Sequence, residues 1–321
     1  MKKIAVLADY LEPSHHALID STAARCGFAV DYYPDGQVPA ELAGTYEVVH
    51  GMPKPGDLKA FTGMKWFCGS FAGVDSYLAD ALYPSPEVIL SNSSGAYGVT
   101  IAEHLIMVTL MLLHHAGAYL RHADAHRWGP VMPMRSIIGS TITVLGTGDI
   151  GTEFARRAKA MGAKEIRGVR RTKKAADPAF DGVYTHAELD SLLPDTDILV
   201  MALPSTADTV GILSRERIAL LPETAYVVNV GRGTAIDQSA LVEALNAGKL
   251  AGAALDVFEK EPIPAGGPVW DAKNLLITPH ISGQMSLGYT RDKNVALFCE
   301  DLENYAAGRP LKRYVDRKIG Y

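Results

Sequence analysis

The chain has 321 residues, of which 48% are hydrophobic and 21% are charged. This length predicts two domains of ~100–200 residues each, and the balance of residues excludes disorder, collagen and a coiled coil. The 31 Lys and Arg residues against 36 Asp and Glu residues give a net charge of -5. A surface that binds duplex nucleic acid needs a basic stripe, so we expect no nucleic-acid partner.

The first part of the chain contains short apolar runs that are typical of strands buried on both faces of a parallel sheet. These runs cover residues 3–8, 28–33, 47–50, 65–68 and 88–91. The first run ends at Asp9 and is too short for the apolar core of a signal peptide, so it predicts a strand. A break at 91–95 precedes a long helix that we expect over 99–120.

The middle of the chain repeats the pattern. Its apolar runs cover residues 141–145, 165–169, 197–203, 225–230, 251–257 and 275–278, and helix patterns at 151–161 and 238–246 lie between them. Alternation of strand and helix predicts open, doubly wound parallel sheets. A second break at 281–284 precedes a last helix over about 287–305, so the second sheet is predicted to be inserted into the first unit.

Cysteine usage and hydropathy bear on location. Cys26, Cys68 and Cys299 form no CxxC pair and no zinc pattern, which favours a reduced, cytoplasmic setting without a metal. The longest apolar stretch, 105–113, is far shorter than the ~20 residues of a membrane span, so no membrane partner is expected. His122 and His126 have a spacing that could hold a metal, but without an HExxH pattern we interpret them as partly exposed helix histidines.

A glycine-rich turn, Gly146-Thr147-Gly148-Asp149-Ile150-Gly151, follows the run 141–145 and opens a helix. This is the context that a dinucleotide-binding turn requires. Gly146 permits the tight turn, Gly148 lets a pyrophosphate approach the backbone, and Gly151 lets the helix pack closely on the strand. The helix N-terminus offers N–H groups to phosphates, and we expect the side chain of Asp149 to point away from them. The alternative interpretation is a glycine-rich turn without a ligand.

The next strand ends in Arg170, Arg171 and Thr172, inside the one local cationic cluster, 167–174. An NAD-binding unit usually carries Asp or Glu here to bind the ribose 2′-hydroxyl. A guanidinium suits a 2′-phosphate instead, which predicts NADP(H) as the preferred cofactor and NAD(H) as the second candidate. The alternative is a solvated run of charges, in which arginines stack on adenine and tolerate either cofactor.

Three polar residues follow three strands of the second unit, namely Arg232, Glu261 and His280. Ligands of open α/β sheets bind beyond the carboxyl ends of the strands. A keto acid that accepts a hydride needs a proton at oxygen, which histidine can donate near neutral pH. A carboxylate partner orients the imidazole, and an arginine holds the substrate carboxylate and polarises the carbonyl. Taken singly, Arg232 could pair with a surface acid, Glu261 could cap a turn and His280 could be a packed core residue.

Several segments together resemble the D-isomer-specific 2-hydroxyacid dehydrogenase family, which includes glyoxylate/hydroxypyruvate reductases and phosphoglycerate dehydrogenases. These segments are Ala102-Glu103-His104, Leu145 to Gly151, Asn229-Val230-Gly231-Arg232-Gly233, Ala254-Leu255-Asp256-Val257-Phe258, Glu261-Pro262 and Pro279-His280-Ile281-Ser282-Gly283. The resemblance implies an α/β fold of two doubly wound parallel-sheet domains. A Rossmann NAD(P)-binding domain (99–286) would be inserted into a flavodoxin-like substrate-binding domain (1–98 and 287–321).

The resemblance also implies roles for matching positions. Arg232 would bind the substrate, His280 would be the acid/base with Glu261 as its partner, and Asp256 would reach the nicotinamide carboxamide. The N–H groups around Ala72, Gly73 and Val74 would receive the substrate carboxylate. The remaining cofactor contacts would come from Leu203, Pro204, Thr209, Val230 and Gly283. Similar enzymes are homodimers joined through the region from Val99 past Trp128.

The sequence is compatible with two functions. The first is an NAD(P)-dependent oxidoreductase that reduces a small 2-keto acid to the D-2-hydroxy acid, with NADP(H) preferred. The second is a corepressor-like binding protein on the same scaffold, in which the cofactor drives assembly with partners. Glu261 stands where formate-specific relatives usually carry Gln, so formate is not expected as a substrate. Because the sequence ends at Tyr321, we also do not expect the C-terminal regulatory domain of serine-biosynthetic members.

Overall fold

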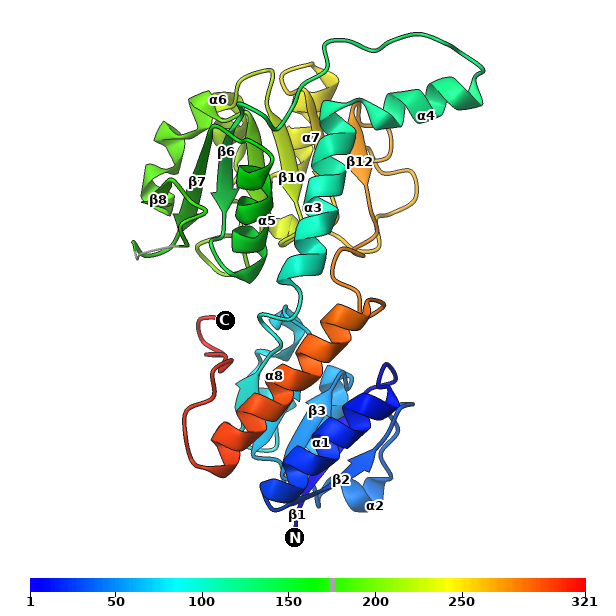
Figure 1. Cartoon of the computed structure of the whole chain (residues 1–321), viewed down its shortest axis with the longest axis vertical. Helices are drawn as coiled ribbons and strands as arrows, with labels where there is room; N and C mark the ends of the chain where they lie inside the picture. The colour runs from blue at the N-terminus through cyan, green and yellow to red at the C-terminus, as the bar shows by residue number, and fades with distance from the viewer. Residues whose placement is uncertain (174–176) are drawn as a thin grey trace. The chain divides into compact units, whose positions relative to one another are not determined.

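Two separate parallel β-sheets organise the computed structural model, which describes residues 1–173 and 177–321 (Figure 1). Each sheet belongs to its own unit of the chain. Unit 1 comprises Met1–Tyr97 and Gln284–Tyr321, and unit 2 comprises Gly98–Gly283. The predicted fold class, two parallel-sheet α/β domains of which one is a Rossmann domain, is confirmed.

Unit 1 contains a five-stranded sheet in the order β2-β1-β3-β4-β5, with every pair parallel. Its strands are β1 (Lys2–Leu7), β2 (Phe28–Tyr32), β3 (Val48–Gly51), β4 (Trp66–Gly69) and β5 (Ile89–Ser91), and its helices are α1 (Pro13–Arg25), α2 (Ala40–Ala43) and α8 (Gly288–Ala306). This strand order is that of flavodoxin-like folds. Helices α1 and α8 lie side by side over the sheet (Figure 1), because both present apolar residues such as Ile19 and Phe298 to one core.

Unit 2 contains a seven-stranded sheet in the order β12-β11-β10-β9-β6-β7-β8, again parallel throughout. Its strands are β6 (Thr141–Leu145), β7 (Glu165–Arg170), β8 (Gly182–Thr185), β9 (Ile198–Met201), β10 (Tyr226–Asn229), β11 (Gly252–Leu255) and β12 (Leu275–Ile277). Its helices are α3 (Gly98–Leu113), α4 (Ala116–Asp124), α5 (Asp149–Ala160), α6 (Arg215–Leu220) and α7 (Gln238–Asn246). Because β6 lies between β7 and β9, the glycine-rich turn after β6 lies at the point where the strand order reverses, which is where Rossmann folds bind dinucleotides.

Both units also contain short 3₁₀ helices. They are η1 (Pro55–Ala60), η2 (Asp75–Tyr77), η3 (Asp80–Leu82), η4 (His186–Ser191), η5 (Leu193–Asp195) and η6 (Gly233–Ala235).

The single long helix predicted over 99–120 is wrong, because the chain forms two helices there. His115 has a φ of 57°, in the left-handed region, and this ends α3 before α4 begins. Strand β8 was not predicted. All four of its residues are half-buried at the edge of the sheet, so it lacks the apolar run that marks the buried strands.

Helix α4 and the loop after it extend away from the sheet of unit 2 (Figure 1). Their exposed apolar side chains are Leu120, Trp128, Met132, Met134 and Ile138. Among the described residues, no single helix is long and apolar enough to cross a membrane. Helices α3 and α4 meet these criteria only when taken together, and they form a pair bent by 65°.

Candidate active site

The glycine-rich turn has the geometry that its sequence predicts. Gly146 has a φ of 102°, and a Cβ at this position would meet the carbonyl oxygen of Ala202 at 2.6 Å. A Cβ on Gly151 would collide with the carbonyl oxygen of Gly146, so only glycine lets α5 pack this closely on β6. Among the described residues, a Cβ on Gly148 would meet nothing within 4 Å. The space beside Gly148, at the start of α5, therefore suits a phosphate group approaching the helix N-terminus.

The carboxylate of Asp149 lies against Gly98, the first residue of α3, because a Cβ built on Gly98 would collide with it. A negative charge at the start of a helix stabilises that helix. The side chain of Asp149 is thus directed toward α3. The backbone N–H groups of Asp149 and Ile150, in the first turn of α5, remain the groups predicted to contact the cofactor.

The cationic residues of the cluster 167–174, at the end of β7 and after it, have different surroundings. Arg167 forms ion pairs with Glu165 (2.7 Å) and Asp195 (3.3 Å), and Lys173 lies 3.3 Å from Glu188. Within residues 1–173 and 177–321, the half-buried guanidinium of Arg170 has no hydrogen-bond or ion-pair partner. Arg171 and Thr172 are exposed, and the last residue of the cluster, Lys174, lies outside the described residues.

Arg170 is close to the glycine-rich turn through the sheet. Strands β6 and β7 are paired, and the N–H of Gly146 donates to the carbonyl of Val169 at 2.8 Å. Arg170 therefore leaves β7 at the level where the turn leaves β6.

Arg232 follows β10 in a turn that Asn229 holds. The amide of Asn229 accepts a hydrogen bond from the N–H of Gly231 and donates to the carbonyl of Arg232, both at 2.9 Å. A Cβ on Gly231 would meet the backbone N and O of Leu203 at 2.7 and 2.6 Å, and a Cβ on Gly233 would collide with Phe258. The two glycines therefore let the turn of Arg232 pack between the segments that follow β9 and β11.

Glu261 and His280 are hydrogen-bonded. The Nδ1 of His280 lies 2.7 Å from one carboxylate oxygen of Glu261, and the other oxygen accepts the N–H of Phe258 at 2.8 Å. Because a carboxylate only accepts, Nδ1 carries the proton of this bond. The side chain of His280 is 52% exposed, and its predicted role as the acid/base stays a prediction.

Asp256 is buried and stabilises the loop 278–282, which carries His280. Its carboxylate accepts hydrogen bonds from the Thr278 hydroxyl (2.6 Å) and from the N–H groups of Ile281 and Ser282 (3.0 Å each). Burial acts to raise the pKa of Asp256, but hydrogen bonds from Ser282, Thr278 and Ile281 outweigh it and lower the pKa below its ordinary value. Asp256 is therefore an anion that fixes the loop, and its predicted contact with a nicotinamide carboxamide stays a prediction.

A neighbouring histidine lies on α3. The hydroxyl of Thr278 is 3.4 Å from the Nε2 of His104. Burial lowers the pKa of His104, with a smaller opposing effect of Asp256. The sequence patterns did not predict a site role for Asn229, Thr278 or His104. Asn229 and Thr278 are polar residues at the carboxyl end of a strand, which is the pattern that could have found them.

The residues predicted to line the adenosine and ribose follow β9 and β10. Leu203 and Val230 are buried, and Pro204 is exposed. The hydroxyl of Thr209 donates to the carbonyl of Pro204 at 2.6 Å and accepts the N–H of Thr206 at 2.8 Å. Thr209 therefore shapes the loop 204–209. Gly283 ends unit 2, three residues after His280.

In unit 1, the predicted carboxylate-binding loop follows β4. Across the described chain, the N–H groups of Phe71, Ala72, Gly73 and Val74 meet no hydrogen-bond acceptor, whereas the N–H of Ser70 donates to Gly51 at 2.9 Å. Successive N–H groups without an acceptor can donate to an anion.

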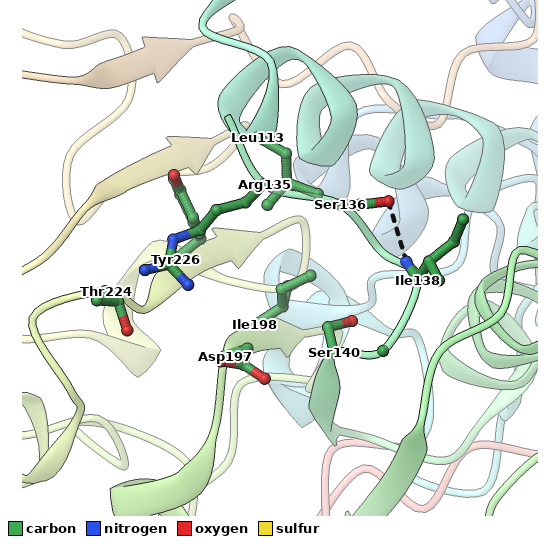
Figure 2. Close-up of a pocket in the computed structure, with 10 residues that line it drawn as sticks. Leu113, Arg135, Ser136, Ile138, Ser140, Asp197, Ile198, Thr224 and Tyr226 are labelled. Atoms are coloured by element: carbon green, nitrogen blue, oxygen red, sulfur yellow. Dashed lines mark hydrogen bonds between the residues drawn. The ribbon is translucent and has the colours of Figure 1, made fainter. Parts of the chain in front are cut away.

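A pocket of about 220 Å³ lies at the opposite, amino-terminal edge of the unit 2 sheet. Figure 2 shows Arg135, Ser140, Asp197, Thr224 and Tyr226 around it, with Ser136 bonded to the N–H of Ile138. None of the residues predicted to bind cofactor or substrate lines this pocket. Within the described residues, no three His, Cys, Asp or Glu side chains gather in a way that could hold a metal.

The comparisons with known proteins agree with this geometry. The family model for the NAD binding domain of D-isomer specific 2-hydroxyacid dehydrogenases matches residues 106–282. The glyoxylate/hydroxypyruvate reductase A of Klebsiella pneumoniae is 32% identical over 257 residues, which is 78% of this chain and 80% of that protein.

Solved structures similar to this chain include two that cover its whole length. One is the NADPH-dependent glyoxylate/hydroxypyruvate reductase of Sinorhizobium meliloti in complex with NADP and sulfate, with a TM-score of 0.83, 27% identity and 100% of both chains covered. The other is a D-isomer specific 2-hydroxyacid dehydrogenase of Xanthobacter autotrophicus in complex with NADPH, with a TM-score of 0.82, 27% identity and coverage of 100% of this chain and 99% of that chain. This chain belongs to the D-isomer specific 2-hydroxyacid dehydrogenase family, and it is an NAD(P)-dependent oxidoreductase.

Proposed function

We propose that this enzyme reduces a small 2-keto acid to the D-2-hydroxy acid with NADPH, using His280 and Glu261 as the proton-donating pair and Arg232 to hold the substrate. The observation that carries the proposal is the hydrogen bond between Glu261 and His280, 2.7 Å long, on a loop that Asp256 braces. The turn of Arg232 lies at the same edge of the sheet, because β10, β11 and β12 are neighbours.

The residues present fit a dinucleotide. The turn 146–151 leaves open space beside Gly148, and Arg170 offers an unpaired guanidinium one strand away among the described residues. When bound, the nicotinamide supplies the hydride that reduces the carbonyl carbon. We propose that the turn binds the pyrophosphate and that Arg170, Arg171 and Thr172 surround the ribose 2′-phosphate.

The chain's own chemistry is proton transfer and charge neutralisation. Glu261 keeps the proton on Nδ1, so a protonated His280 can donate from Nε2 to the substrate oxygen as that oxygen gains negative charge. Arg232 carries a permanent charge that can bind the substrate carboxylate and polarise the carbonyl. In unit 1, the N–H groups of loop 71–74, which have no partner among the described residues, are the groups proposed to donate to a substrate carboxylate. In the oxidative direction, neutral His280 accepts the proton.

A preference for NADPH over NADH follows from the same arrangement. A guanidinium is a strong donor to a phosphate and has no acceptor for a ribose hydroxyl. The two relatives solved with NADPH or NADP support this preference.

The test is the loss of NADPH absorbance with glyoxylate, hydroxypyruvate, pyruvate and phenylpyruvate, repeated with NADH. Turnover with at least one keto acid, and a higher kcat/KM with NADPH, is the expected result. Tight cofactor binding without turnover of any keto acid would reject the proposal and favour the corepressor-like alternative, which no observation on the structure favours.

We further propose that two copies of the chain associate through α3, α4 and the loop past Trp128. The exposed apolar residues of α4 and its loop support this proposal, since apolar surface gathered on a projecting segment is typical of a contact between proteins. The cytoplasmic location stays a prediction.

A further inference from the structure

The loop after β4 is tied to the segment after β5 by four consecutive carbonyl groups. The carbonyl of Gly69 accepts the Ser93 hydroxyl (2.9 Å), and that of Ser70 accepts the Tyr97 hydroxyl (2.5 Å). The carbonyl of Phe71 accepts the N–H of Ser93 (2.9 Å), and that of Ala72 accepts the side-chain amide of Asn92 (2.7 Å). Every donor belongs to the six residues 92–97.

This pattern determines which way the loop's N–H groups face. The peptide bonds of the loop are trans, since the cis bonds among the described residues lie elsewhere. In a trans peptide the C=O of one residue and the N–H of the next point in opposite directions. With the carbonyls of Ser70, Phe71 and Ala72 turned toward 92–97, the N–H groups of residues 71–73 are turned away from it.

A second set of hydrogen bonds links the loop after β4 and the segment after β5 to α8. The Tyr10 hydroxyl lies 2.7 Å from both the Ser70 hydroxyl and the carbonyl oxygen of the Asn294 side chain, and the Asn294 amide donates to Ser93 at 2.6 Å. The amide oxygen only accepts, so Tyr10 donates to Asn294 and Ser70 donates to Tyr10. The Tyr10 hydroxyl thus both accepts and donates, and Asn294 links it to Ser93.

These groups are buried. Ser70 and Asn294 are fully inaccessible, and the exposed fractions of Ser93, Tyr97 and Tyr10 are 2%, 5% and 9%. Burial raises the pKa of Tyr10 and of Tyr97, so both hydroxyls stay protonated as donors. Loss of one member would leave a buried partner without a hydrogen bond, which is costly.

We infer that Tyr10, Asn92, Ser93 and Asn294 are positioning residues that hold loop 70–74 with its N–H groups presented to the carboxylate of a 2-keto acid. The inference rests on the proposed function, because the substrate supplies the carboxylate. None of the four residues is assigned a contact with substrate, and each acts through the loop.

The test uses Tyr10→Phe and Ser93→Ala in the full-length enzyme with NADPH. Loss of a hydroxyl that orders the loop weakens carboxylate binding equally in the ground and transition states. The KM for glyoxylate should therefore rise about threefold to tenfold, with kcat within twofold of wild type. The Kd of oxalate, an unreactive dicarboxylate probe measured by titration, should rise by the same factor, and the Kd of NADPH should not change.

Matched controls separate positioning from general loss of packing. Tyr305→Phe removes a half-buried hydroxyl that lies 3.1 Å from Glu47, at the amino-terminal end of the same sheet. Ser140→Ala removes a buried hydroxyl that donates to a backbone carbonyl in unit 2. Both should keep the wild-type KM and oxalate Kd, and Ser93→Thr, which retains a hydroxyl, should restore much of the affinity lost in Ser93→Ala.

The outcomes distinguish this inference from the proposed function. Wild-type turnover with an unchanged KM and oxalate Kd in both variants would overturn the inference alone. Oxalate binding that weakens in the variants, in an enzyme that turns over no keto acid, would uphold the inference and reject the proposed function. Absence of oxalate binding by the wild type, or a parallel loss of kcat, NADPH binding and Tm in the variants, would overturn the inference.

Discussion

His280 occupies a backbone conformation that its own side chain does not favour. Its φ is 53°, in the left-handed region that non-glycine residues rarely adopt. The N–H of His280 donates to the carbonyl of Asp256 at 2.9 Å, and the Asp256 carboxylate accepts three further hydrogen bonds from the same loop. These bonds hold the imidazole where Glu261 can accept the proton of Nδ1.

Replacement of His280 by alanine should slow keto-acid reduction by ~10²–10⁴-fold, because a positioned acid contributes that much to proton transfer. The Kd of NADPH should stay within twofold of wild type, since the turn 146–151 is unaltered. His16→Ala, on α1 of unit 1, is a matched control that should keep wild-type turnover. Near-normal turnover in His280→Ala would remove it from the acid role.

At this scale, the sequence was enough to predict that Glu261 partners His280 but not the loop that surrounds them. Strand ends can be found from apolar runs, and residues that follow neighbouring strands share an edge. The brace by Asp256 depends on donors that lie 22 to 26 residues away, and on a left-handed residue that no local pattern marks. Polar networks of this kind join residues far apart in the sequence and exist only in the folded chain.

Strand β7 ends at Arg170, the residue proposed to determine the preference for NADPH over NADH. Arg167 and Lys173 are engaged by acidic side chains, whereas Arg170 has no partner in the described part of the chain. The sequence alone gives no reason to distinguish one cationic residue of this cluster from another. The structure distinguishes them by their ion pairs.

Arg170→Asp should lower the ratio of kcat/KM with NADPH to kcat/KM with NADH by about tenfold to a hundredfold. A charge-assisted hydrogen bond to the 2′-phosphate is lost, and a carboxylate that can accept from the 2′-hydroxyl replaces it. Lys164→Asp, just before the other end of β7, makes the same change of charge and should leave the ratio unaltered. An unchanged ratio in Arg170→Asp would mean that this residue does not face the 2′ position.

The predicted elements show where pattern is sufficient and where it fails. The buried strands were located to within a few residues, because both of their faces are apolar. Strand β8 was not predicted because it is short, half-buried and at an edge. The bend between α3 and α4 was not predicted because residues on both sides of His115 favour a helix. The backbone of one residue thus changed the direction of the segment that carries Leu120.

At the scale of the whole molecule, stability in acid depends on His50. This residue of β3 is fully buried, stacks on Phe298 at 4.0 Å, and donates from Nδ1 to the carbonyl of Cys68. Its Nε2 has no partner among the described residues. Burial lowers the pKa of His50 from 6.5 to about 4, against a smaller opposing effect of its bond to Cys68.

The folded state therefore binds fewer protons than the unfolded state between pH 4 and pH 6.5. Stability is present above this window and is lost as the pH falls through it, by about 3 kcal/mol over the full window. In urea unfolding, wild type should lose about 2 kcal/mol more between pH 7 and pH 5 than His50→Gln. His114→Gln, at an exposed site after α3, should keep the wild-type pH dependence. Equal losses in wild type and His50→Gln would contradict the assignment.

The proposed association of two copies is tested through α4. Leu120 is 62% exposed, and Leu120→Glu would place a charge in an apolar contact, which is costly to bury. We expect light scattering to report a dimer for wild type and a shift toward monomer for Leu120→Glu. Leu18→Glu, an exposed leucine of α1, should stay dimeric. A monomeric wild type would refute the proposal directly.

The continuity of unit 2 has an evolutionary consequence. Residues 98–283 form one uninterrupted insertion, and this stretch encodes the glycine-rich turn, Arg170, Arg232, Glu261 and His280. The residues proposed to bind the cofactor and to transfer the proton therefore lie on one continuous stretch of the gene, and loop 70–74 lies outside it. Substitutions in the two flanking segments can alter loop 70–74 without touching any of those residues.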